Sequence, residues 1–120
     1  MRDADRTDLG TLCDNETVVS RLRDALPDSA RLDGLATVFK AVSHPARLAM
    51  LHLLATHEGC VCDIAHTLQM PVSTVSQHLR ILKGSGLLTS RPDGKWVIYS
   101  LTDTPLARAV SERSLLEAVE

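Results

Sequence analysis

The sequence predicts a mainly α-helical domain with a β-hairpin wing, arranged as a winged helix-turn-helix. Two stretches of helical periodicity are separated by the turn residues Gln69-Met70-Pro71, which predicts a helix-turn-helix. Directly after them, two runs of β-forming residues flank Asp93-Gly94, which indicates a hairpin with a type I′ turn. The chain has 120 residues, of which 44% are apolar, and this suits one domain with an aliphatic core.

The N-terminal part of the chain predicts an arm followed by two helices. Residues 1–13 are polar and show no periodicity, so we interpret them as a flexible arm that ends at Cys13. Asp14 is a suitable N-cap for a first helix, which Pro27 would end. A second helix is expected over about residues 31–42, where apolar residues recur on one face.

Residues 14–120 are expected to form the winged-helix domain, with its terminal helices in a homodimer interface. Ser43-His44-Pro45 interrupts the chain and begins a third helix, because proline fits the first helical turn. The remaining predicted elements are helices at 45–57, 61–68, 72–83 and 105–118 and strands at 87–91 and 95–101. The apolar dimer surface is expected from Val110, Leu115, Val18 and Leu22.

Composition and charge indicate a cytoplasmic protein with a basic region. No apolar run reaches the ~18 residues of a membrane span, and the charged N-terminus lacks the apolar segment of a secretory signal. Three cysteines, an odd number, favour reduced thiols over a disulfide framework. Residues 1–35 carry five bases and eight acids, net −3, whereas residues 71–100 carry four bases and one acid, net +3. A local basic face can meet DNA phosphates, although charge alone is equally compatible with an ordinary solvated surface.

The predicted helix over residues 72–83 is the candidate DNA-reading element. If its apolar residues face the core, the exposed faces carry side chains suited to phosphates and base edges: Ser73, Thr74, Ser76, Gln77 and Arg80. Arg91 and Lys95 flank the hairpin tip, from which a wing can reach a neighbouring groove. We interpret His78 as a packed, hydrogen-bonded residue. The competing interpretation is an amphipathic helix with an ordinary polar face.

Cys60 and Cys62 stand one residue apart at the start of the short helix that precedes the turn. Two thiols at this spacing can bind one soft ion, and a helix N-terminus favours the thiolate. Cys13 on the arm is a candidate third ligand, with Asp63 or His57 as a further donor. Such a set suits As(III), Sb(III), Pb(II), Cd(II) or Zn(II). The competing interpretation treats the cysteines as small buried hydrophobic residues.

Five segments together form a specific combination of motifs. They are Phe39-Lys40-Ala41-Val42-Ser43-His44-Pro45-Ala46-Arg47-Leu48, Cys60-Val61-Cys62-Asp63-Ile64-Ala65, Ser73-Thr74-Val75-Ser76-Gln77-His78-Leu79-Arg80-Ile81-Leu82, Gly86-Leu87-Leu88 and Asp93-Gly94-Lys95-Trp96-Val97-Ile98-Tyr99-Ser100-Leu101. Over about residues 35–103 they resemble the ArsR/SmtB family of bacterial metal-sensing repressors.

The resemblance implies a homodimer that binds an inverted repeat in double-stranded operator DNA when it is free of effector, and that a thiophilic ion releases. The chain looks most like the CadC-type sensors of cadmium, lead and zinc, in which cysteine on an N-terminal arm, often from the other subunit, joins the C-V-C-D segment. Cys13, Cys60 and Cys62 fall on those positions. The arm carries a single cysteine and no histidine, and Ala65 stands where arsenic sensors can carry cysteine. As(III), Sb(III) and Pb(II) therefore stay open beside Cd(II).

A second zinc site of the family uses Asp-x-His and His-x-x-Glu on the last helix. Here Asp103 is retained, but Pro105 holds the histidine position and residues 104–120 contain no histidine. We therefore expect this second site to be absent.

These observations predict a metal- or metalloid-responsive transcriptional repressor with ligands Cys13, Cys60, Cys62 and Asp63. The alternative is a redox- or persulfide-sensing repressor that uses the same cysteines, and a purely structural zinc site is also open. We do not expect an enzyme or a small organic substrate, because C-x-C is not the C-x-x-C of thiol oxidoreductases. No nucleophile–base–acid set or phosphate loop is visible either.

Overall fold

The computed structural model describes residues 15–119, so the predicted arm at residues 1–13, with Cys13, lies outside the described part. The chain divides into two units, residues 1–32 and residues 33–120, and each is described by itself. Within residues 15–119, no helix is long and apolar enough to cross a membrane.

The described residues of the first unit begin with α2 (Glu16–Ala25). Its N-cap is Asn15, whose Oδ1 accepts a hydrogen bond from the backbone N–H of Val18 at 3.1 Å. The cap predicted at Asp14 was therefore placed one residue too early. Leu22, on the apolar stripe of this helix, is 66% exposed.

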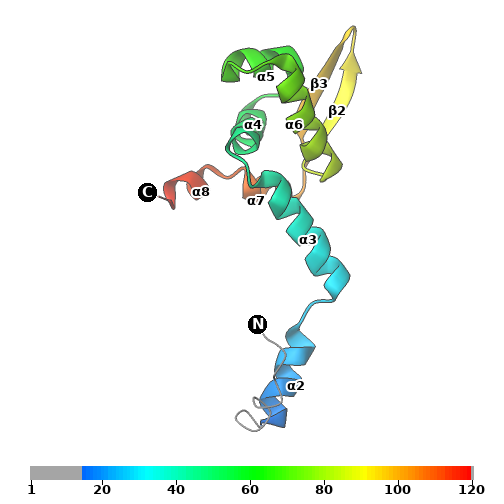
Figure 1. The fold of residues 1–120 in the computed structure, drawn as a ribbon, viewed down its shortest axis with the longest axis vertical. Coiled ribbons are helices and arrows are strands. Elements are labelled where there is room, and N and C mark those ends of the chain that lie inside the picture. Colours follow the sequence, from blue (N-terminus) through cyan, green and yellow to red (C-terminus); the bar gives the residue numbers. More distant parts are fainter. Residues whose placement is uncertain (1–14, 120) are drawn as a thin grey trace. The chain divides into compact units, whose positions relative to one another are not determined.

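Helix α3 (Ser29–Val42) runs across the boundary between the units and begins two residues earlier than predicted. In the second unit, the chain continues through α4 (Pro45–Thr56), α5 (Val61–Leu68) and α6 (Val72–Gly84). Helices α5 and α6 form the helix-turn-helix (Figure 1). Gln69 makes the sharp turn after α5 in a left-handed conformation, with φ 54°.

A three-stranded antiparallel sheet completes the winged-helix layout, in the order β1-β3-β2. Strands β2 (Leu88–Asp93) and β3 (Trp96–Leu101) form the predicted hairpin, which projects from the helices as a wing (Figure 1). The turn residues are Gly94-Lys95, and of these Gly94 alone has a positive φ, 63°. A positive φ at the first central residue alone fits a type II′ turn, so the predicted type I′ turn is wrong. The short strand β1 (Gly59–Cys60) was not predicted.

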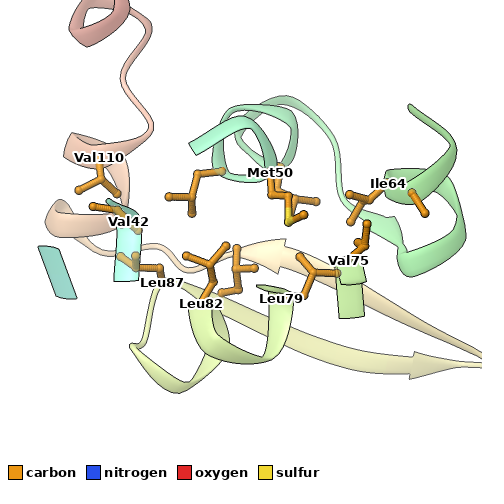
Figure 2. Packing of buried hydrophobic residues seen from close by; sticks show 13 residues of the cluster. Val42, Met50, Ile64, Val75, Leu79, Leu82, Leu87 and Val110 are labelled. Atoms are coloured by element: carbon orange, nitrogen blue, oxygen red, sulfur yellow. The ribbon is translucent and has the colours of Figure 1, made fainter. Parts of the chain in front are cut away.

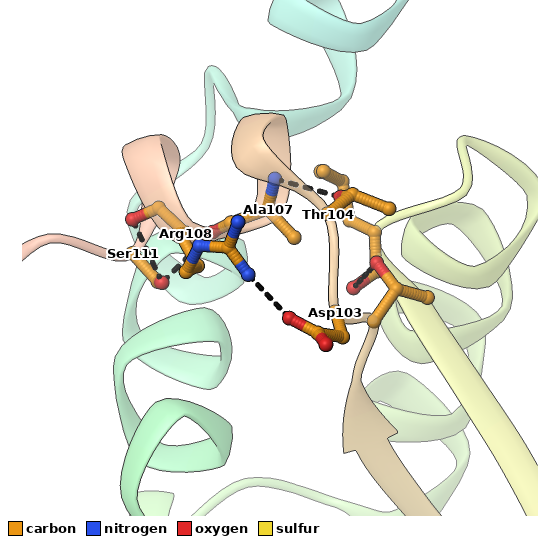
Figure 3. Close-up of polar contacts among 7 residues, drawn as sticks. Asp103, Thr104, Ala107, Arg108 and Ser111 are labelled. Carbon is orange, nitrogen blue, oxygen red and sulfur yellow. Dashed lines mark hydrogen bonds and ion pairs between the residues drawn. The ribbon is translucent and has the colours of Figure 1, made fainter.

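The predicted C-terminal helix over residues 105–118 is in fact two short helices, α7 (Pro105–Val110) and α8 (Arg113–Glu117). Figure 3 shows the side chains at the two ends of α7. The Thr104 hydroxyl caps its start by accepting from the Ala107 N–H at 3.1 Å. At its end, the Ser111 hydroxyl donates to the Ala107 carbonyl at 2.8 Å, and such back-bonding weakens a helix.

The hydrophobic core lies between α4, α6, α7 and the base of the hairpin (Figure 2). Its largest fully buried side chains are Met50, Leu51, Val75, Leu79, Leu82 and Leu87. Val110 belongs to this core and is 6% exposed, so its predicted place on a dimer surface is wrong. Helical periodicity placed Val110 on the apolar face of its helix, but that face packs in the core of its own domain.

Candidate DNA-binding surface and thiol site

Helix α6 presents a polar face opposite the face that packs in the core. Val75, Leu79 and Leu82 are fully buried. Among the predicted DNA contacts on this helix, Ser73, Gln77 and Arg80 are exposed, whereas Thr74 and Ser76 are half-buried. The structure therefore places a hydroxyl, an amide and a guanidinium where a major groove could meet them.

His78 of this helix is held by residues at the start of α4. Arg47 in α4 donates from Nε to His78 Nδ1 at 3.1 Å and from Nη1 to the Ala41 carbonyl at 3.2 Å. The His44 ring lies 4.7 Å from the His78 ring, tilted by 58°. Burial, followed by the charges of His44 and Arg47, lowers the pKa of His78. His78 is therefore a neutral, packed residue in this site, in line with its interpretation from the sequence.

The wing carries both of the basic residues predicted to contact DNA, in different surroundings. Lys95 lies in the hairpin turn, with its ammonium 5.2 Å from the centre of the Trp96 ring. Both residues are exposed. Arg91, in β2, donates from Nη1 and Nη2 to the two carboxylate oxygens of Glu58 at 2.7 and 2.6 Å. Lys95 is thus available for a contact at the hairpin tip, whereas Arg91 is already paired with the Glu58 carboxylate.

The two cysteines of the C-x-C segment lie in different environments. Cys60 ends β1 and is the N-cap of α5, and it is 9% exposed. Its thiol donates to Asp63 Oδ2 at 3.2 Å, and its backbone N–H lies 3.5 Å from the same oxygen. Cys62, in the first turn of α5, is exposed and lines an open hollow with His66 and Met70. Both cysteines are free thiols.

The structure describes some, but not all, of the residues predicted to bind an ion. Within residues 15–119, no three His, Cys, Asp or Glu side chains converge as ligands for an ion. Asp63 is already beside Cys60, and His57 follows α4 and lines a pocket with Gly59 and Asp63. The structure brings the Cys60 thiol and the Asp63 carboxylate together, whereas Cys62 lines a separate hollow. The predicted third ligand, Cys13, lies outside the described residues.

The thiol segment is part of the same sheet as the wing. In β1, Gly59 pairs with Tyr99 and Cys60 pairs with Ile98 of β3. Ile98 in turn pairs with Arg91 of β2. Cys60 and Arg91 therefore stand in one cross-strand row, although they are far apart in the sequence. The pairing of the three strands thus connects Cys60 with the wing.

The retained residue of the second family zinc site has another partner. The Asp103 carboxylate accepts a hydrogen bond from the guanidinium of Arg108, one turn into α7 (Figure 3). This carboxylate is thus engaged in an ion pair at the start of the helix. The sequence reasoning did not foresee this pair.

Comparison with known proteins assigns the chain to a family of regulators. Residues 44–90, from the N-cap of α4 into β2, match the family model described as bacterial regulatory protein, arsR family. The chain is 36% identical over 102 residues to a cadmium resistance transcriptional regulatory protein, a CadC homolog of Staphylococcus aureus, with 84% of each chain covered. The chain belongs to the ArsR family. As a member of a family of transcriptional regulators, it is not an enzyme.

Further relatives of this ArsR-family chain agree with its fold. It is 38% identical over 96 residues to a transcriptional repressor SmtB homolog of Synechocystis, with 77% of this chain and 73% of the relative covered. A solved homodimeric winged helix-turn-helix DNA-binding domain from Mycobacterium bovis, a possible ArsR-family regulator, is 34% identical with a TM-score of 0.68. That comparison covers 79% of this chain and 87% of the other. The predicted winged helix-turn-helix is confirmed.

Proposed function

We propose that this chain is a metal- or metalloid-responsive transcriptional repressor. The observation that carries the proposal is the position of Cys60, which ends a strand paired with the wing and caps the first helix of the helix-turn-helix. An ion bound there acts on both parts of the DNA-binding module. The names of the relatives, a cadmium resistance regulator and a repressor, support the same function.

In this proposal, the effector-free protein binds operator DNA as a homodimer. The exposed Leu22 and Leu115 offer apolar surface on the terminal helices. A two-fold dimer presents two recognition helices to half-sites about 34 Å apart, so the operator is an inverted repeat. The side chains proposed to contact DNA are Ser73, Thr74, Ser76, Gln77, Arg80, Arg91 and Lys95.

The effector is a thiophilic ion held by Cys13, Cys60 and Cys62, with Asp63 as a further donor. The Cys60 thiol donates a hydrogen bond to the Asp63 carboxylate. When bound, the ion supplies a positive charge that stabilises the thiolates and replaces the thiol proton. Cd(II), Pb(II), As(III) and Sb(III) fit a sulfur-rich set, and Zn(II) fits if a fourth donor is added.

Ion binding and DNA binding then weaken each other. A coupling free energy of about 1–3 kcal/mol, roughly a five- to 150-fold change in affinity, is the usual scale for such linkage. Because linkage is reciprocal, DNA weakens ion binding by the same factor as the ion weakens DNA binding.

A titration of DNA binding tests the proposal. The ion-free protein is used to select a duplex from a random pool, and binding to it is followed by fluorescence anisotropy with each of the five ions. We expect at least one ion to lower the affinity, a chelator to restore it, and Cys60→Ser to abolish the response. Ser114→Ala, a change at an exposed residue of α8 outside the thiol segment, is the control and keeps the response. If none of the ions changes the affinity of the wild-type protein, the proposal is wrong.

The second candidate function is a redox or persulfide sensor. The exposure of the free thiol of Cys62 favours it, because an accessible thiolate reacts readily with peroxides or polysulfides. Release of the duplex by hydrogen peroxide in the presence of a chelator, reversed by dithiothreitol, would support this function. Release by ions alone would support the metal-responsive repressor.

A further inference from the structure

Glu58 and Arg91 connect the thiol segment to the wing by a two-point ion pair. The guanidinium donates one hydrogen bond to each carboxylate oxygen, at 2.7 and 2.6 Å. The hydrogen bond and the charge of its partner raise the pKa of Arg91 and lower the pKa of Glu58. Asp93, near the tip of the same strand, adds to the effect on Arg91 through its charge.

The pair stands at the place where the thiol site meets the sheet. Glu58 directly precedes β1 and is two residues from Cys60. Arg91 is paired through Ile98 with Cys60 in the same cross-strand row. An ion that holds Cys60 in place therefore also restrains β1, which directly follows Glu58, and β3, which pairs with the strand that carries Arg91.

We propose that Glu58 couples the thiol site to the wing, because Glu58 and a DNA phosphate compete for the Arg91 guanidinium and a bound ion favours Glu58. This inference rests on the proposed function. A guanidinium engages a carboxylate or a phosphate with the same pair of donors, so it binds one of them at a time in this manner.

The exposure of the pair fits an exchange of partners rather than a structural role. The side chain of Arg91 is 52% exposed and that of Glu58 is 49% exposed. Exposed ion pairs of this kind contribute little to folding, so Arg91 can leave Glu58 without loss of the fold. In the ion-free protein, β1 is a strand of two residues, and the DNA phosphate displaces Glu58 from the Arg91 guanidinium. With Cys60 and Cys62 held by an ion, Glu58 is fixed opposite Arg91 and the wing loses its phosphate contact.

The test compares Glu58→Gln with Asp93→Asn, which removes an equal charge near the same guanidinium but away from the thiol segment. DNA binding to the selected duplex is measured for both variants and the wild type, with and without Cd(II) and As(III). We expect Glu58→Gln to raise the affinity of the ion-loaded protein by about two- to fivefold, the scale of an exposed ion pair, and to change the ion-free affinity less. The ratio of the two affinities therefore falls by a similar factor.

The control and a double variant separate coupling from general electrostatics. Asp93→Asn raises the affinity of both forms equally and leaves their ratio unchanged. In an Arg91→Gln background, Glu58→Gln has no further effect on the ratio, because the contested guanidinium is gone. Thermal unfolding of Glu58→Gln matches the wild type if the pair has no structural role.

The outcomes distinguish this inference from the proposed function. A wild-type protein that responds to an ion, together with an unchanged ratio in Glu58→Gln, overturns the inference and leaves the proposed function intact. An equal fall in the ratio for Glu58→Gln and Asp93→Asn also overturns it, since the effect is then general repulsion of phosphate. A wild-type protein that responds to no ion overturns both.

Discussion

Arg47 donates a hydrogen bond from Nε to Nδ1 of His78 at 3.1 Å and so ties α4 to the recognition helix α6. The same guanidinium reaches the Ala41 carbonyl at the end of α3. Three helices thus meet at one cation. Because Nδ1 accepts this bond, His78 is neutral in the folded chain, and a protonated ring would face Arg47 with a like charge.

The first prediction is that the free energy of unfolding falls on acidification because His78 becomes protonated. The pKa of His78 in the folded chain lies below its ordinary value of 6.5, chiefly because of burial and then because of His44 and Arg47. Between pH 6.5 and the lower pKa, the unfolded chain binds more protons, so the contribution is fully present above pH 6.5 and is lost as pH falls through the folded pKa. Urea unfolding at pH 8.0, 6.5 and 5.5, at fixed protein concentration, measures the loss.

The matched variants for this measurement each remove one histidine. His78→Asn keeps an acceptor for Arg47 but does not titrate, so its stability is expected to depend less on pH than that of the wild type. His66→Asn, at an exposed site of α5, is expected to retain the wild-type dependence. Equal pH dependence in His78→Asn and the wild type would contradict the assignment to His78.

A second prediction concerns the face by which α6 packs in the core. Leu79 is fully buried, whereas Ile81, two residues later in the same helix, is 43% exposed. Leu79→Ala is expected to lower the free energy of unfolding by about 2–5 kcal/mol, because it removes buried surface and leaves a cavity. Ile81→Ala is expected to cost about 0.5 kcal/mol or less. Urea unfolding of both variants checks the orientation, and a larger loss at Ile81 would mean that the helix is rotated.

The helix-turn-helix and the hairpin were predictable because their signals are local. Apolar residues at helical spacing placed Val75, Leu79 and Leu82 in the core, and Asp93-Gly94 marked the hairpin. The type of the hairpin turn was not predictable, because it depends on which two residues are central. The pairing of Asp93 with Trp96 makes Gly94 and Lys95 the central residues.

The features that the sequence did not reveal depend on partners distant in the chain. Strand β1 is two residues long and exists through its pairing with β3, about 40 positions later in the sequence. Glu58 and Arg91 are 33 residues apart and share no local pattern. Val110 has the periodicity of a surface helix, and its burial depends on packing in the hydrophobic core, to which α4 contributes next to α7. Periodicity therefore predicted the elements, but not the contacts between them.

A third prediction uses the unequal exposure of the two described cysteines. Cys62 is exposed and Cys60 is 9% exposed and hydrogen-bonded to Asp63. In a Cys13→Ser background, a thiol reagent is expected to modify Cys62 quickly and Cys60 slowly, because reactivity requires access to the thiolate. Mass spectrometry of peptides at successive times measures both rates, and in urea the two rates are expected to become similar. Faster modification of Cys60 in the folded protein would contradict the position of its side chain.

The last prediction separates base recognition from phosphate binding on the DNA surface. Arg80 is exposed on α6 and Lys95 is exposed at the wing tip. Arg80→Ala is expected to cost about 1–3 kcal/mol of binding to the selected duplex and much less on an unrelated duplex, because a guanidinium in the major groove reads base edges. Lys95→Ala is expected to weaken both complexes alike and to reduce the slope of log affinity against log salt by about 1, because a lysine at the wing neutralises a phosphate. Anisotropy at several salt concentrations measures both quantities, and Arg113→Ala, on α8, is the control that should change neither. An equal loss on both duplexes for Arg80→Ala would assign Arg80 to the phosphate backbone instead.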